Sequence, residues 1–339
     1  MTVHPTPPGS FGIDASDNLA AYFAMAQLPF IVGHKDVPKP PPEGHKSHLN
    51  SLRVRPERHR RLERIVHADP SRSTRLVTAY AEKTIPDEDG PPLAGDIDPT
   101  SGRRLTVPCN PTFNVPKPKG VGPVNDKDSF EAWLLNMPLE TTERAMHLVF
   151  PKQTYGYWRY NARHKGDADE DLVKIVTWET VVANRHDPRT IGAVIFIQPL
   201  WVLADRDMKS FLACTSFPSF DQTRELNSSE RLWAKIYDSC IARHTPWFVL
   251  TNYNTWAFGV FSKGWTKAHI VHVCQNTARE PTVIQTLFYW LASSMHFPDT
   301  FVPPEVRGEC PRPREDIPCL LYDVMAFNPC AARAVAVLA

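Results

Sequence analysis

The side chains best suited to chemistry form a basic run between residues 51 and 69. Its arginines are Arg53, Arg55, Arg58, Arg60, Arg61 and Arg64. Guanidinium groups bind phosphate oxygens, so Arg58, Arg60 and Arg61 are candidate phosphate contacts, provided that they share one face of a helix. Two glutamates interrupt the run, and this alternation is equally typical of a solvated helix with salt bridges. The sequence leaves both interpretations open.

Histidines and cysteines offer two other kinds of site, a metal centre and a thiol nucleophile. His269 and His272 lie in one predicted strand, and strict alternation puts them on opposite faces, which argues against a shared metal. Cys240 and His244 are spaced for one helix face, but two residues do not make a nucleophilic site. Seven cysteines without metal-like spacing predict reduced thiols. The chain has no GxSxG, HExxH, phosphate-binding glycine loop or dinucleotide fingerprint.

The elements that must position a site are clearest in residues 228–295. Apolar residues at helical spacing behind serine caps predict a helix that ends near His244. β-Branched and aromatic residues after Pro246 predict three antiparallel strands, with turns at 252–254 and 263–264. An apolar stripe after Pro281 predicts a second, mostly buried helix.

Upstream segments complete the predicted fold. Residues 126–150 are expected to form two short helices joined at Pro138. The segments YGYWRY, LVKIVTWETVV and GAVIFIQPLWVL predict three more strands. The expected class is α/β (α+β), with a mixed central sheet flanked by helices.

The wording WFVLTNYNTWAFGVF, preceded by a helix, carries a resemblance to a known family. It resembles the distal half of the PD-(D/E)XK nuclease superfamily, in its restriction-type branch, and is similar to proteins of mushroom-forming fungi. The resemblance covers roughly residues 171–295. It implies a restriction-endonuclease-like core, in which an aspartate and a Glu-x-Lys pair on adjacent strands just before a helix hold a divalent metal that activates water.

This resemblance assigns the catalytic positions to Asp171, Phe196 and Gln198. Asp171 matches the first acid, while Phe196 occupies the place of the glutamate and Gln198 that of the lysine. Phenylalanine offers no metal ligand, and an amide neither carries charge nor exchanges protons near neutral pH. The resemblance therefore implies a degenerate nuclease-like pseudoenzyme, which acts as a binding or interaction module without a cofactor.

Two alternatives keep chemistry in the same cleft. In one, an enzyme holds a small apolar metabolite in a pocket lined by Phe196, Gln198 and Trp201, with Trp256 as a further candidate lining residue. In the other, a nuclease dependent on Mg²⁺ uses acids and lysines that have migrated along the fold. The lysine candidates are Lys174, Lys209 and Lys235, and the acid candidates are Glu179 and Glu225. The candidate catalytic residues are thus Asp171, Gln198 and Lys235.

Composition bounds the domain organisation. The 38 basic and 37 acidic residues nearly cancel, so there is no global signal for nucleic acid. Of 33 prolines, 18 precede Lys119, which predicts an irregular proline-rich arm with little room for long helices. We expect this arm at residues 1–120, a core at 121–298 and a C-terminal wrap at 299–339, in one globular unit.

The N-terminal sequence predicts an intracellular protein, cytoplasmic or nuclear, with no membrane partner. Its first residues lack the pattern of a secretory signal, and Pro29 interrupts the longest apolar stretch, 19–32. The partner itself is not specified by the sequence, and a small molecule or a nucleic acid are the candidates.

Overall fold

A seven-stranded mixed sheet forms the centre of this protein in a computed structural model, which describes residues 18–31, 52, 54, 60–87, 105–107, 124, 126–154, 157–162, 172–181, 189–218 and 225–309. The strand order is β1-β7-β6-β5-β4-β3-β2. The strands are β1 (Arg64–His67), β2 (Trp158–Asn161), β3 (Lys174–Thr180), β4 (Ile191–Ile197), β5 (Trp247–Thr251), β6 (Thr255–Phe261) and β7 (Lys267–Gln275). This arrangement confirms the predicted α+β class with a mixed sheet.

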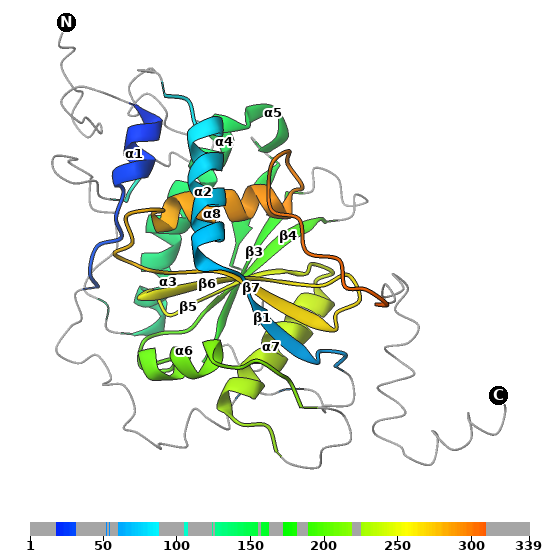
Figure 1. The fold of residues 1–339 in the computed structure, drawn as a ribbon. Coiled ribbons are helices and arrows are strands. Elements are labelled where there is room, and N and C mark those ends of the chain that lie inside the picture. Colours follow the sequence, from blue (N-terminus) through cyan, green and yellow to red (C-terminus); the bar gives the residue numbers. More distant parts are fainter. Residues whose placement is uncertain are drawn as a thin grey trace, which may run out of the picture.

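Helices cover both faces of the sheet and make a three-layered structure (Figure 1). They are α1 (Leu19–Met25), α2 (Pro70–Thr84), α3 (Lys127–Leu134), α4 (Glu140–Val149), α5 (Pro151–Thr154), α6 (Asp205–Leu212), α7 (Ser228–Ala242) and α8 (Val283–Ser294). One face, here called the α8 face, packs against α2, α4 and α8, and the opposite α7 face packs against α6 and α7 (Figure 1). Among the described residues, no helix has both the length and the apolar character to cross a membrane.

Residues 228–295 form the predicted helix, three strands and second helix, although α7 is capped by Asn227 and not by the serines. Helix α7 begins at a capping box, in which Asn227 Oδ1 accepts from Glu230 N and Glu230 Oε2 accepts from Asn227 N. Strands β5, β6 and β7 pair antiparallel. Helix α8 starts behind Thr282 and is buried along its whole length, which explains why its sequence is mostly apolar and carries no charge.

The crossover between β4 and β5 positions the candidate site. These strands pair in parallel, and the chain passes from one to the other through α6 and α7. A parallel pair requires such a crossover, which brings the start of α7 to the carboxyl end of β4. Both strands are buried on both faces, and this accounts for their lack of polar alternation.

Two expectations for the first 120 residues are wrong: that they have little room for a long helix, and that the basic run is helical throughout. Helix α2 has 15 residues, and β1 joins the sheet parallel to β7, so this region contains a long helix and a core strand. Residues 60–84 hold a single proline, Pro70, at the first turn of α2, where a missing N–H costs little. The end of the basic run, Arg64–His67, is therefore a strand and not part of a helix.

The expected joint between two helices at Pro138 is confirmed. A π-helical turn, Leu135–Leu139, contains this proline and connects α3 to α4. The π turn absorbs the hydrogen bond that proline cannot donate, because its backbone already departs from the α-helical pattern.

Candidate functional site

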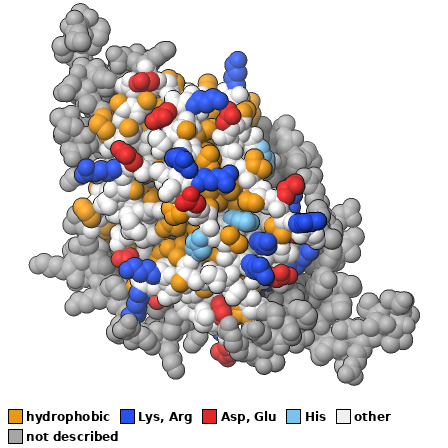
Figure 2. All heavy atoms as spheres, in the orientation of Figure 1, with side chains coloured by type: hydrophobic (Ala, Val, Ile, Leu, Met, Phe, Trp, Pro, Cys, Tyr) orange, Lys and Arg blue, Asp and Glu red, His pale blue; other side chains and the backbone are white. Residues whose placement is uncertain are grey.

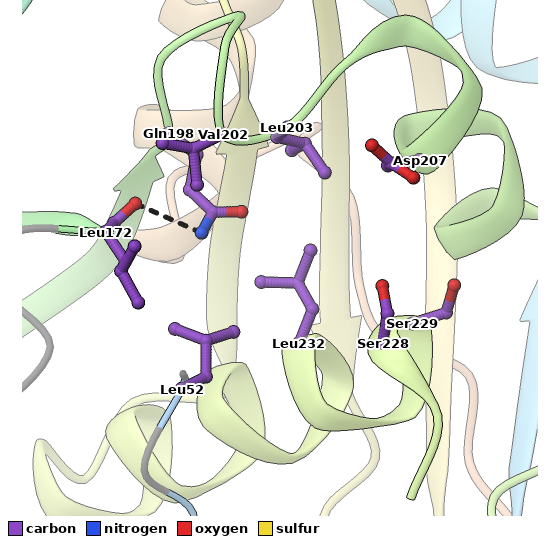
Figure 3. Close-up of a pocket in the computed structure, with 9 residues that line it drawn as sticks. All are labelled: Leu52, Leu172, Gln198, Val202, Leu203, Asp207, Ser228, Ser229 and Leu232. Atoms are coloured by element: carbon purple, nitrogen blue, oxygen red, sulfur yellow. Dashed lines mark hydrogen bonds between the residues drawn. The ribbon is translucent and has the colours of Figure 1, made fainter. Parts of the chain in front are cut away.

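A small pocket lies at the carboxyl end of β4, where the chain leaves the sheet toward α6 (Figure 3). It is lined by Leu52, Leu172, Gln198, Val202, Leu203, Asp207, Ser228, Ser229 and Leu232. The space that a water molecule can occupy inside it is about 20 Å³, which is room for one water-sized group. Open α/β sheets bind ligands outside the carboxyl ends of their parallel strands, so this pocket is the candidate site.

Gln198 supplies a polar group to this pocket. Its side chain belongs to a residue that is 3% exposed, and its Nε2 donates to Leu172 O at 3.1 Å. Figure 3 shows the amide oxygen turned toward the interior of the pocket. That oxygen accepts no hydrogen bond from the part of the chain that the structure describes. The pocket thus presents an acceptor that a small donor, such as water, can satisfy.

The wall across from Gln198 combines a helix start with a carboxylate. Ser228 and Ser229 begin α7, and Asp207 projects from α6 (Figure 3). Arg206 Nε lies 3.8 Å from Asp207 Oδ1. The positive end of the α7 dipole is already met by the Glu230 carboxylate of the capping box. The remaining lining residues are aliphatic, so the pocket is polar on one side and apolar on the other.

The structure separates the aromatic residues that were assigned to one cleft. Phe196 has 0% exposure and belongs to the core of the α7 face, whereas Trp256, also at 0%, belongs to the core of the α8 face. Trp201 is half-buried and contacts Phe130 on the α8 face, with ring centroids 5.8 Å apart. Of the residues assigned to binding or catalysis, Gln198 lines the pocket and these three aromatic side chains do not.

The candidate lysines are also dispersed. Lys235 is 8% exposed within α7. Lys174 Nζ pairs with Glu131 Oε2 at 3.2 Å, which ties β3 to α3. Lys209 lies on the exposed side of α6. Sequence reasoning missed Glu131, because an acid on an amphipathic helix carries no signal of the strand that it will face.

The candidate acids have other partners or lie elsewhere. Glu179, near the far end of β3, accepts hydrogen bonds from Thr177 Oγ1 and Asn161 Nδ2, each at 2.7 Å. The Glu225 side chain is 90% exposed. Asp171 lies outside the described residues, although the next residue, Leu172, lines the pocket.

The basic run is fastened to α7. Arg60 donates from Nε to Asp238 Oδ1 at 3.0 Å and from Nη2 to Asp238 Oδ2 at 2.6 Å. Its side chain has 0% exposure, so this guanidinium is occupied by a buried bidentate ion pair. The backbone of Arg61 donates to Tyr237 Oη at 3.1 Å, while its side chain is exposed. Arg58 lies outside the described residues.

A bulge overturns the expected alternation of the two histidines in β7. The pairing shifts by one residue between Phe258 and Gly259. His269 is opposite Val260 and His272 is opposite Phe258, and these two partners of β6 share the α8 face. Both histidines therefore lie on one face, because a bulge reverses the alternation beyond it. No group of three or more metal-ligating side chains forms among the residues described.

The remaining nucleophile candidates are inert in this setting. Burial lowers the pKa of His272 to about 4, and its Nδ1 lies 2.9 Å from Ser73 Oγ, which locks α2 to β7. Burial raises the pKa of the Cys240 thiol, so little thiolate forms. His244 follows the end of α7 with a positive φ of 54° and does not continue the helix face of Cys240.

Comparison with protein-family models, curated proteins and solved structures gave no match. The candidate site is therefore defined by its geometry, and its central feature is a small pocket in which the Gln198 amide oxygen accepts no hydrogen bond from the described residues.

Proposed function

We propose that this chain is a nuclease-like domain without a working site for metal-assisted hydrolysis, and that it acts as a binding or interaction module. The order of its elements supports the nuclease-like part. Strands β3 and β4 pair antiparallel, the short helix α6 and then α7 follow them, and β5 returns parallel to β4. This is the hairpin and following helix that the resemblance implies. The proposal includes the restriction-endonuclease-like core.

The observation that carries the non-catalytic part is the burial of Phe196. This residue occupies the position of the metal-ligating glutamate and is 0% exposed beneath α7. A carboxylate placed there would be surrounded by apolar side chains, at a cost of several kcal/mol for an unpaired ion. On this proposal, core packing takes the place of the metal site. Gln198, two residues on, retains contact with a pocket but carries no charge.

The size of the pocket supports the same conclusion. The space of about 20 Å³ suits one water-sized group, whereas a drug-sized ligand needs roughly 300 Å³ or more. A scissile phosphodiester with a metal ion requires a much wider cleft. A metabolite would also have to displace several of the lining side chains.

A cleavage assay tests this function. The full chain is incubated with Mg²⁺ or Mn²⁺ and labelled single- and double-stranded DNA and RNA, beside the Asp171→Ala variant and a matched surface variant, Glu82→Ala. We expect no metal-dependent product from any of the three proteins. Cleavage that Asp171→Ala abolishes and Glu82→Ala retains would contradict the proposal and establish the migrated-acid alternative.

A thermal-shift screen of small apolar compounds separates the metabolite alternative. A ligand that binds the folded state raises the unfolding midpoint, by an amount that grows with its concentration. We expect no compound to do so through this pocket. A shift that disappears in Gln198→Leu but not in Gln275→Leu, which changes an exposed glutamine, would establish a small-molecule site instead.

A further inference from the structure

Cationic side chains gather where β1, β7 and α2 meet, with apolar atoms between them (Figure 2). The residues are Arg64 and Val66 of β1, Lys267 of β7, and Arg72, Arg75 and Leu76 of α2, and together they are called the basic surface. The three arginines are exposed and Lys267 is half-buried. Val66 and Leu76 are 39% and 37% exposed, so this surface offers apolar atoms as well as cations.

The sheet fixes one half of this surface. Arg64 is the register partner of Lys267 in the parallel pair of β1 and β7. Partners on adjacent strands point to the same face and lie about 4.8 Å apart along the sheet. Val66 is two residues beyond Arg64 and shares that face. The alternate positions, such as Ile65, point into the core of the α7 face, so this half of the surface projects on the side of α2.

Helix α2 fixes the other half. Its first turn is held to β7 by the contact between Ser73 and His272 and by the hydrogen bond from Ala68 N to Ile270 O at 2.9 Å. Arg72 and Leu76 are four residues apart and share one flank of the helix. His272, which contacts α2, lies five residue steps beyond Lys267 along β7, so the basic surface extends over roughly 17 Å.

The four cations of the basic surface are not held by ion pairs within the part of the chain that the structure describes. Nearby lysines outside the surface differ, since Lys83 pairs with Asp299 and Lys263 pairs with Glu305. Three acids lie beside the surface along the chain or across the turn: Asp69 caps α2, Glu309 accepts from Ser262 and Thr266, and Glu63, next to Arg64, is exposed.

We propose that the basic surface binds a short acidic segment of a partner protein, in which apolar side chains alternate with carboxylates. This inference rests on the proposed function, because a domain that binds without cutting needs a surface for its partner. An extended peptide of about five residues spans 17 Å, and its side chains on one face recur roughly every 6.8 Å. Its carboxylates meet the cations, and its apolar side chains cover Val66 and Leu76.

A nucleic acid fits this surface less well. A phosphodiester backbone offers anions but no apolar groups for the two aliphatic side chains. The chain as a whole has a net charge of only +1, so a long polyanion would meet acidic residues beyond the basic surface. A short segment covers the uncompensated cations and ends there.

A peptide-binding measurement tests the proposal. The probe is a fluorescent peptide of about twelve residues with alternating glutamate and leucine, measured by anisotropy in EDTA at about 50 mM salt, where exposed charges are weakly screened. We expect the double variants Arg64→Gln/Lys267→Gln and Arg72→Gln/Arg75→Gln each to weaken binding about fivefold, as the loss of two exposed ion pairs implies. Peptides with glutamine for glutamate, or serine for leucine, should bind more weakly.

The matched control is Lys209→Gln/Arg279→Gln, which removes the same two residue types from exposed positions elsewhere. It should bind the peptide like the unchanged protein. The proposal is overturned if this control weakens binding as much as the surface variants do, if the unchanged protein does not bind, or if single-stranded DNA of equal charge competes better than the peptide. Cleavage in Mg²⁺ would instead overturn the proposed function. Peptide binding is measured in EDTA, where no metal-dependent cleavage occurs, so the two results can be distinguished.

Discussion

The two edges of the sheet are closed in different ways. At the β2 edge, α4 supplies buried side chains in place of a further strand: Glu143 Oε2 accepts from Tyr160 N at 2.8 Å, and His147 Nε2 lies 2.9 Å from Trp158 O. At the β1 edge, an extended segment hydrogen-bonds to the strand, with Ile65 N donating to Thr215 O at 2.9 Å. Both edges thus have partners for backbone groups that could recruit a strand from another chain.

The difference lies in the side chains around each edge. At the β2 edge, the half-buried ring of Trp158 stacks on the buried ring of Trp178, with centroids 5.6 Å apart. The β1 edge carries outward-facing cations with no acidic partners among the described residues. The β2 edge is thus closed by packed aromatic side chains, whereas the β1 edge presents cations that a partner could contact. Binding at β1 must therefore use side chains and not strand addition.

The largest effect is expected at the packed edge. Trp178→Ala removes a fully buried indole between Trp158 and Tyr160, and large aromatic truncations in cores cost about 3–5 kcal/mol. Urea unfolding should show this loss. Tyr157→Ala, on the same edge but 58% exposed, should change the free energy of unfolding by less than about 0.5 kcal/mol. Similar losses in both variants would mean that the edge is not packed as described.

A slightly smaller loss is expected where the β1 edge is anchored to α7. Arg60→Ala leaves the Asp238 carboxylate without its bidentate partner, and breaking a buried ion pair costs about 3 kcal/mol or more. The double variant Arg60→Met/Asp238→Leu should recover much of the loss in urea unfolding, because no lone charge remains. If the double variant is as unstable as the single one, the lost packing of the arginine and not the unpaired charge is responsible.

The hydrogen bond between Glu143 and the β2 edge should contribute less to the free energy of unfolding than Trp178 or the Arg60–Asp238 pair. Glu143→Ala leaves the Tyr160 N–H without its acceptor, and an unsatisfied buried donor costs about 1–3 kcal/mol. Glu143→Gln keeps an acceptor oxygen at the same place and should lie between the alanine variant and the unchanged protein. Amide hydrogen exchange at Tyr160 provides the local measurement. Exchange that is equally slow in both variants would show that the side chain does not close this edge.

The sequence predicted the interior of the molecule better than its edges. The helix and three strands in residues 228–275 follow from caps, turns and apolar runs, all of which are local signals. Strand β1 could not be found in this way, since the arginines that surround it imitate an exposed helix and its pairing with β7 is 200 residues away along the chain. The bulge in β7 was equally hidden, because strict alternation assumes an unbroken ladder.

For the site, the sequence identified one residue of the pocket, but the side chains predicted to lie beside it were wrong. Gln198 was identified because a strand pattern and a resemblance both pointed to it. Phe196 and Trp256 were grouped with it, yet the parity of each strand sends them to opposite faces of the sheet. Leu52 and Asp207 line the pocket through tertiary contacts that no local pattern encodes.

The smallest effect concerns the chain segment that follows α8 and borders the β1 side. Glu309 fastens this segment to the turn between β6 and β7, where Thr266 N donates to its carboxylate at 2.9 Å. Burial opposes ionisation of Glu309, but hydrogen bonds from Ser262, Thr266 and the backbone of Gly264 outweigh it and lower the pKa from 4.5 to about 2. Because the folded-state pKa lies below the unfolded one, the stabilisation is complete above about pH 4.5 and disappears as the pH falls toward 2.

Comparison of the unchanged protein with Glu309→Gln over a pH series tests this contribution. The difference in free energy of unfolding should be constant near neutral pH and shrink between pH 4.5 and 2, the range over which the native carboxylate becomes protonated. Glu305→Gln, whose carboxylate is 82% exposed beside Lys263, should show little difference at any pH. A Glu309 difference that stays constant down to pH 2 would mean that the segment is held by its packing, chiefly Phe301 against Trp247 and Trp290, and not by the carboxylate.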